Sequence, residues 1–126
     1  MENLDRHFTL DRAGNGNGIL TPWGKAQVST EFSPGLLLVE TAGHGGFLLS
    51  HKFASESLSE AGRKRGEEFN QWLAFEEDSA ANIVIYELMD LVAKGYPGLH
   101  KERLVSELER DFPGYLEELE GVEAVG

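Results

Sequence analysis

The histidine in Gly43-His44-Gly45-Gly46 is the residue of this sequence that is best suited to acid–base chemistry. An imidazole on a loop can act as a general base, a general acid or a metal ligand near neutral pH. Three consecutive acids, Glu76, Glu77 and Asp78, could orient the imidazole or hold a divalent ion together with it. These residue types are compatible with a small hydrolase or a metal-dependent enzyme.

The same residues also have a structural interpretation, and it is the one that we favour. Glycine takes backbone conformations that other residues avoid, so a histidine among glycines is typical of a tight turn. Acids at the beginning of a helix complement its dipole without any ligand. The sequence has no GxSxG nucleophile pattern and no HExxH or HxxxH spacing of metal ligands. We therefore predict no catalytic residue, no metal and no cofactor, with His44 as the one candidate for chemistry.

An excess of acidic residues dominates the composition. The chain has 22 Asp and Glu against 11 Lys and Arg, which gives a net charge of −11. Such a charge repels nucleic-acid phosphates and anionic membranes and attracts basic surfaces, although it could also serve solubility alone. We expect no direct nucleic-acid or membrane binding, and a basic host protein or nucleoprotein complex as partner. The acids expected at that contact are Glu76, Glu77, Asp78, Glu107, Asp111, Glu117, Glu118 and Glu120.

The length and composition indicate one globular domain. At 126 residues, of which 40% are hydrophobic, the chain is long enough for a single core. It has no cysteine, no secretory signal pattern and no apolar run near the roughly 18 residues of a membrane span, so we expect a cytoplasmic protein. We predict a flexible segment at 1–20, a single α+β domain at 21–120 and a frayed tail at 121–126.

The first half of that domain has the pattern of a three-stranded antiparallel meander. Residues 25–32 contain β-favouring types, and two short apolar runs follow at 36–39 and 47–49. The glycines of 43–46 form a hairpin connection between the last two strands, so His44 is expected at a hairpin tip. The exposed edge of such a meander could pair in a homodimer.

The second half is predicted to form about three helices that pack on one face of the meander. The first helix covers residues 60–72. Its bases at 63–65 are expected to form ion pairs with its own acids, three or four positions away.

The other two predicted helices differ in their burial. The apolar segment 80–94 should be the central buried helix, with Asp78 or Ser79 as its N-cap. The pattern of the last segment, 100–120, predicts an amphipathic helix that is interrupted at Pro113-Gly114.

Two blocks of the sequence resemble a known domain. The first block consists of Trp23-Gly24-Lys25-Ala26-Gln27, Gly35, Thr41, His44-Gly45-Gly46 and Leu49-Ser50, and the second of Trp72 and Phe75-Glu76-Glu77-Asp78. This pattern, WGxAQ followed by HGG and FEED, resembles a small domain of unknown function carried by bacterial plasmid and phage proteins. The similarity covers about residues 21–90.

The resemblance implies a protein of a mobile element but no mechanism. Small acidic proteins of such elements often resemble counter-defence factors, including anti-CRISPR and anti-restriction inhibitors. We therefore predict a non-enzymatic protein that blocks a nucleic-acid-handling host defence complex through its acidic surface. The alternative is the hydrolase or metal-dependent enzyme that uses His44 with Glu76, Glu77 or Asp78.

Overall fold

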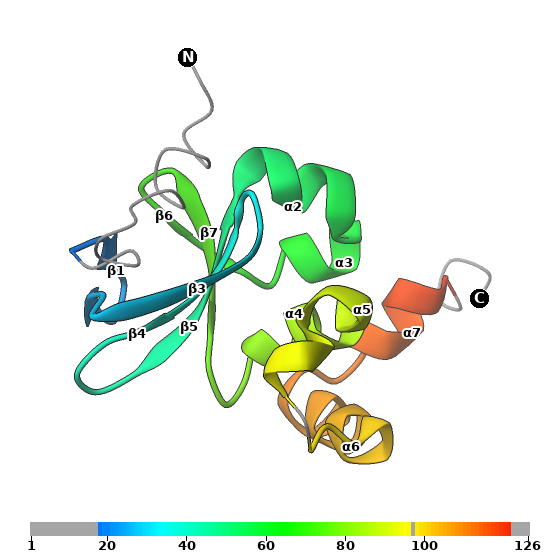
Figure 1. The fold of residues 1–126 in the computed structure, drawn as a ribbon. Coiled ribbons are helices and arrows are strands. Elements are labelled where there is room, and N and C mark those ends of the chain that lie inside the picture. The colour runs from blue at the N-terminus through cyan, green and yellow to red at the C-terminus, as the bar shows by residue number, and fades with distance from the viewer. Residues whose placement is uncertain (1–17, 97, 122–126) are drawn as a thin grey trace.

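The computed structural model describes residues 18–96 and 98–121, and this part of the chain forms an α+β fold, as predicted (Figure 1). Its strands are β1 (Leu20–Thr21), β2 (Gly24–Lys25), β3 (Val28–Ser33), β4 (Leu36–Glu40), β5 (Gly45–Ser50), β6 (Glu67–Phe69) and β7 (Trp72–Glu76). Its helices are α2 (His51–Ser57), α3 (Glu60–Arg63), α4 (Ala81–Glu87), α5 (Met89–Val92), the 3₁₀ turn η1 (Ala93–Gly95), α6 (Lys101–Asp111) and α7 (Tyr115–Glu120). The predicted flexible segment at 1–20 and the predicted tail at 121–126 lie almost entirely outside the described residues.

Five strands form one antiparallel sheet in the order β3-β4-β5-β7-β6. The predicted meander is present as β3, β4 and β5, but it is only one part of this larger sheet. β4 pairs with β5 from Leu36 opposite Leu49 to Glu40 opposite Gly45, so residues 41–44 form the tip of the hairpin. β1 and β2 form a separate two-stranded ribbon.

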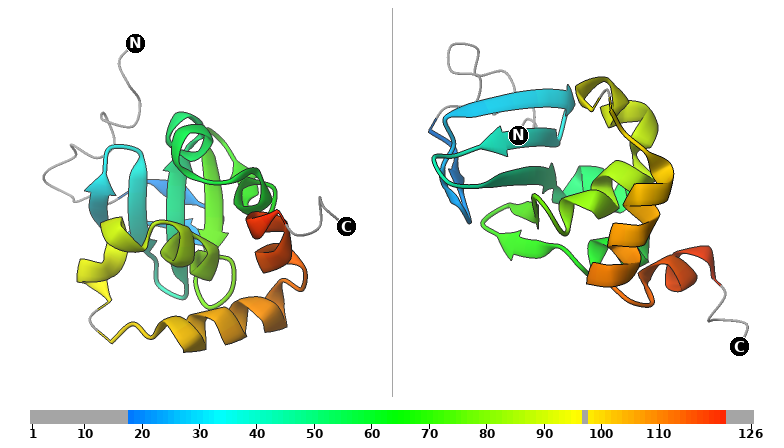
Figure 2. Two further views of the ribbon diagram at one scale, coloured as in Figure 1. Left: turned by 90° about the vertical axis from the view of Figure 1, so that its right-hand side faces the viewer. Right: turned by 90° about the horizontal axis from the view of Figure 1, so that it is seen from below.

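Strand β5 lies in the middle of the sheet, and all of its residues are buried. Successive side chains of a strand point to opposite faces. Phe47 and Leu49 belong to the large core that the sheet forms with the helices. Leu48 belongs to a smaller cluster on the opposite face, together with Ile19 and Ala26 beside the β1–β2 ribbon. The helices therefore cover one face of the sheet, and the ribbon lies on the other side (Figure 2).

The prediction of a helix over residues 60–72 is wrong. Helix α3 ends at Arg63, and β6 and β7 form an antiparallel hairpin in its place. Leu73 and Phe75 of β7 pack in the core under the helices, whereas Trp72 and Ala74 pack in the cluster on the opposite face. A strand beside β5 is buried on both of its faces, and its side chains alternate between the two clusters. The burial of these apolar side chains outweighs the local helical pattern of the sequence.

The predicted buried helix is shorter than expected, and its predicted cap is wrong. α4 buries the apolar run that begins at Ala81 but ends at Glu87, after which α5 and η1 follow. Ala80 occupies the N-cap and makes no side-chain hydrogen bond there, so neither Asp78 nor Ser79 caps this helix. Asp78 instead has a φ of 72° in the turn after β7, a conformation that Asp tolerates better than most residues.

The last predicted helix is divided where its sequence indicates. α6 ends at Asp111 and α7 begins at Tyr115, with Pro113 and Gly114 between them. Gly114 has a φ of 91°, a left-handed conformation that glycine adopts without a steric cost.

A polar cluster around Glu87 holds α7 against the rest of the domain. Tyr115 is fully buried, and its hydroxyl donates a hydrogen bond to the Glu87 carboxylate. The backbone N–H and the hydroxyl of Ser59 donate to the same carboxylate at 2.8 and 2.7 Å. Burial and then the bond to Glu87 raise the pKa of the Tyr115 hydroxyl well above its usual range. The phenol therefore stays protonated and remains a donor.

Lys64 and Arg65 pair with α7 instead of with the acids of their own segment, and Arg63 donates to the carbonyl of Leu58 at 2.7 Å, which corrects the prediction. Lys64 and Arg65 both form ion pairs with Glu118, the latter at 3.0 Å. The guanidinium of Arg65 also lies 5.4 Å from the centre of the Tyr115 ring. These contacts join residues that are far apart in the sequence, so a spacing rule for one helix could not find them.

Replacing Tyr115 by Phe should destabilise the fold because the Glu87 carboxylate loses a donor. We expect the free energy of unfolding to fall by about 1.5–3 kcal/mol, the range for hydrogen bonds to charged groups. Because the folded-state pKa of Tyr115 is raised, the unfolded chain releases the phenolic proton first, and the wild type loses stability as the pH rises above about 10. Urea unfolding at about pH 7 and about pH 10.5 should show a smaller difference between the two proteins at the higher pH.

A Tyr86→Phe variant is the matched control. The hydroxyl of Tyr86 makes no hydrogen bond to another described residue, so its removal should change the free energy of unfolding by less than about 0.5 kcal/mol. Equal destabilisation by the Tyr86 and Tyr115 variants would contradict the role given to the bond with Glu87.

Candidate functional site

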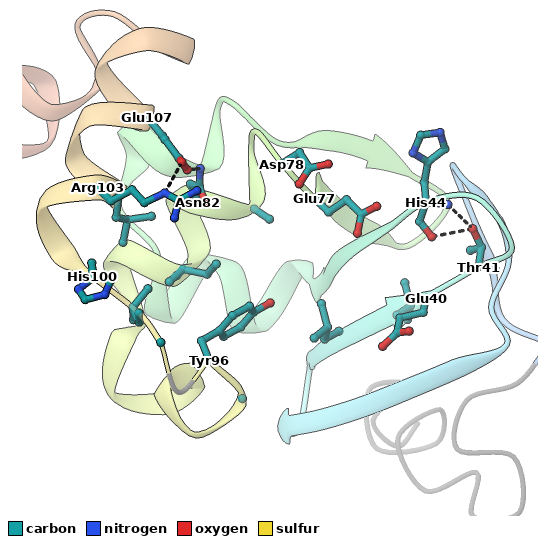
Figure 3. A pocket seen from close by; sticks show the side chains of 18 of the residues that line it. Glu40, Thr41, His44, Glu77, Asp78, Asn82, Tyr96, His100, Arg103 and Glu107 are labelled. Atoms are coloured by element: carbon teal, nitrogen blue, oxygen red, sulfur yellow. Dashed lines mark hydrogen bonds and ion pairs between the residues drawn. The ribbon is translucent and has the colours of Figure 1, made fainter.

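A hollow of about 830 Å³ opens between the β4–β5 hairpin, the turn after β7 and helix α6 (Figure 3). Apolar residues of its lining are Leu38, Val39, Ala81, Ile85, Leu99 and Leu104. Polar residues of its lining are Glu40, Thr41, His44, Glu77, Asp78, Asn82, Tyr96, His100, Arg103 and Glu107. A concave surface that combines apolar walls with a few convergent polar groups is the usual form of a binding site.

His44 lies at the hairpin tip, as its sequence indicates, and its backbone is held by Thr41. The N–H and hydroxyl of Thr41 donate to the His44 carbonyl at 2.8 and 2.7 Å, and the N–H of His44 donates to the Thr41 hydroxyl at 3.1 Å. Its imidazole is exposed and makes no hydrogen bond or ion pair with another described residue. Figure 3 shows the ring at the rim of the hollow, pointing away from Tyr96.

The two glycines after His44 are required by close packing of β5 between its neighbours. A Cβ on Gly45 would lie 2.5 Å from the carbonyl oxygen of Val39. A Cβ on Gly46 would lie 2.3 Å from the carbonyl oxygen of Phe75 and 2.7 Å from the ring of Trp23. A steric constraint of the sheet therefore explains the two glycines of the HGG sequence, and this explanation needs no chemical role of the imidazole.

The acids that follow β7 separate at the hollow. Glu77 and Asp78 line it, whereas Glu76, at the end of β7, does not. The N–H of Glu77 donates to the carbonyl of Gly45 at 2.9 Å, which ties the turn after β7 to the hairpin. The structure thus brings His44, Glu77 and Asp78 to one hollow, from segments that are far apart in the sequence.

Several polar residues of the hollow were missed as site candidates by sequence reasoning, and Glu40 and Tyr96 matter most among them. Glu40 is the last residue of β4, where an acid after an apolar strand signals only a solvent-facing position. Tyr96 follows η1 and is half-buried. Burial raises the pKa of Tyr96, and the carboxylates of Glu77 and Glu40 raise it further, so its hydroxyl is neutral near pH 7. No local pattern predicts that these three side chains share one space.

The wall formed by α6 has its charges paired within the protein. The amide of Asn82 donates to one oxygen of Glu107 at 3.1 Å, and the guanidinium of Arg103 donates to the other at 3.2 Å. Glu107 is therefore engaged on both oxygens, in contrast to the acids on the hairpin side of the hollow.

The eight acids predicted at a partner contact divide into two groups. Glu107, Asp111 and Glu118 form hydrogen bonds or ion pairs within the domain. The hydrogen bond from Arg110 lowers the pKa of Asp111. The hydrogen bonds from Lys64 and Arg65 lower the pKa of Glu118. The remaining five form no ion pair with a described residue: Glu76, Glu77, Asp78, Glu117 and Glu120.

Neither a metal cluster nor a membrane helix is found in the described part of the chain. Within residues 18–96 and 98–121, no group of three His, Cys, Asp or Glu side chains is arranged to hold a metal ion. None of the helices in these ranges is both long enough and apolar enough to cross a membrane.

Comparison with known proteins identifies the family of the whole domain. A family described as "Domain of unknown function (DUF7007)" matches residues 16–125. The chain belongs to this DUF7007 family. The match extends beyond the blocks at 21–90 and includes α6 and α7, so the C-terminal helices are part of the family's domain. No curated protein and no solved structure matches the chain.

A comparison of two glycines beside His44 tests the structural explanation of the HGG sequence. Gly46→Ala should lower the free energy of unfolding by about 3 kcal/mol or more, because its Cβ would meet backbone atoms that cannot move aside. Gly43→Ala should change it by less than about 0.5 kcal/mol, since a Cβ there meets nothing within 4 Å. Urea unfolding measures both, and equal effects of the two substitutions would refute the explanation.

Proposed function

We propose that this protein acts by binding, and that it captures a basic partner on the hairpin side of the hollow. The observation that carries this proposal is the position of Glu40, Glu77 and Asp78. These carboxylates reach one hollow from two different segments and form no ion pair with a described residue. Carboxylates that lie around a concave surface without an internal ion pair are suited to bind a cationic group of another molecule.

The charge of the whole chain supports the same proposal. A net charge of −11 increases the rate at which a basic partner is encountered and disfavours nucleic acid as the direct ligand. Of the five predicted contact acids without an internal ion pair, Glu76 ends β7, Glu77 and Asp78 lie in the turn after it, and Glu117 and Glu120 lie on α7. We assign the main contact to the turn after β7, because it lines the hollow and α7 does not.

The proposed partner is a basic host protein or nucleoprotein complex in the cytoplasm. Nucleic-acid-handling defence complexes bind phosphate through basic surfaces. An acidic protein of a mobile element could occupy such a surface in place of the nucleic acid and inhibit the complex, as anti-CRISPR and anti-restriction proteins do. The charge of this chain and the resemblance to plasmid and phage domains support that setting.

A second candidate function is hydrolysis with His44 as the base. Its support is that His44, Glu77 and Asp78 line the same hollow, where a carboxylate could orient a water or an imidazole. This candidate requires the exposed imidazole to turn into the hollow. A His44→Ala variant separates the two functions, because it should abolish turnover of a substrate but leave capture of a basic partner intact.

Charge reversal at the hollow should remove partner binding. We expect Glu40→Lys/Glu77→Lys to weaken binding at least about tenfold, because partly buried charge pairs across an interface contribute more than exposed ones. Asp78 is left unchanged, because its φ of 72° disfavours a longer side chain. The measurement is affinity capture from host lysate at about 50 and about 500 mM salt, followed by titration of the purified partner.

The variant Glu117→Lys/Glu120→Lys is the matched control, since it changes the net charge by the same amount on α7. We expect it to retain most of the binding, with the same loss at high salt as the wild type. If the α7 variant abolished binding and the hollow variant did not, the contact would lie on the C-terminal acids. Binding that neither charge reversal nor salt weakens would refute the proposal as a whole.

A further inference from the structure

We propose that the hollow receives an arginine side chain of the partner, with its guanidinium between Glu40 and Glu77 and against the ring of Tyr96. This inference rests on the proposed function and names the chemical group that the hollow binds. The three side chains come from the end of β4, from the turn after β7 and from the residue after η1, and all three line the hollow.

Tyr96 is the fixed element of this subsite. Its ring lies beside that of Phe47, a fully buried residue, with 6.5 Å between the ring centres, so the core supports it. In Figure 3 its hydroxyl points toward the part of the hollow that holds Glu40 and Glu77. Both carboxylates are near enough to act electrostatically on the phenol. A supported aromatic ring with two carboxylates nearby is a favourable setting for an organic cation.

The remaining lining suits the stem of a long basic side chain. Leu38, Ile85 and Leu99 line the same hollow. The methylene groups of arginine or lysine cover apolar surface of this kind while the charged head reaches polar groups. A bare metal ion would gain nothing from these residues, and the described residues offer no group of three ligands for one.

The charge around the hollow directs a cation to the hairpin side. On the opposite wall Glu107 already receives hydrogen bonds from Asn82 and Arg103. Arg103 would repel a second cation there. Glu40 and Glu77 form no ion pair with a described residue. The negative charge that remains available to a cation therefore lies on the hairpin side of the hollow.

Arginine fits this arrangement better than lysine. A guanidinium is planar, so it can stack on an aromatic ring and at the same time direct N–H donors along its edge to two carboxylates. The ammonium of lysine is a compact charge with a tighter water shell, and it gains less from a ring and from separated acceptors.

Nuclear magnetic resonance titration of the full chain with three capped pentapeptides tests the proposal. Each peptide has alanine at four positions and arginine, lysine or citrulline at the centre. We expect the arginine peptide to shift the amide signals of Glu40, Glu77 and Tyr96. Its dissociation constant should be roughly threefold or more below that of the lysine peptide. The citrulline peptide, which keeps the shape but lacks the charge, should cause no shift at these positions.

Substitutions in the subsite provide a second measurement. Tyr96→Leu should weaken the arginine peptide roughly three- to tenfold, whereas Tyr96→Phe, which keeps the ring, should stay within about twofold of the wild type. Glu77→Gln should also weaken it, and Glu67→Gln on β6, outside the hollow, should not. If Tyr96→Leu does not fold, the comparison of the two glutamine variants decides the question.

The possible failures are distinguishable. Equal affinity for the arginine and lysine peptides, or shifts located at α7 instead of the hollow, would overturn the subsite. The proposed function would still stand if Glu40→Lys/Glu77→Lys removed capture of the partner. If the peptide bound as described but that variant captured the partner normally, the assignment of the hollow as the partner contact would be the part that fails.

Discussion

The close approach of β5 to both of its neighbours is the constraint on which the rest of the domain depends. β5 is buried along its whole length, and at Gly46 it leaves no room for a side chain between itself and β7. Trp23 closes over the same position, and the hydroxyl oxygen of Thr41 lies 3.2 Å from the carbonyl oxygen of Trp23. The ribbon, the hairpin and β7 therefore meet at one point, and the hollow opens beside it.

This constraint also prepares the candidate site. The bond from the N–H of Glu77 to Gly45 holds the turn after β7 against the hairpin that carries Glu40. Two acids are thereby held near each other by backbone bonds before any ligand arrives. A site that is ordered in advance loses less conformational entropy on binding, which favours affinity from few contacts. The cost is a region in which glycine cannot be replaced.

The acids of the chain differ in whether they have partners within the domain. Glu87, Glu107 and Glu118 join helices to one another through Tyr115, Asn82 and the bases before β6, so they contribute to the fold. The acids around the hairpin side of the hollow have no such internal role. Glu40, Glu77 and Asp78 are thus acids without an internal ion pair that lie where the surface is concave.

Local sequence patterns were sufficient to predict the α+β class, the strands of the meander, the hairpin tip at His44 and the break between α6 and α7. These depend on neighbours within a few residues: alternation, glycine, proline and apolar runs. Three features follow from the packing of distant segments: residues 67–76 form a hairpin, Lys64 and Arg65 pair with Glu118, and Glu40, Glu77 and Tyr96 share a hollow. The physical reason is that burial on two faces, and pairing between distant charges, are properties of packed elements and leave no periodic trace along the chain.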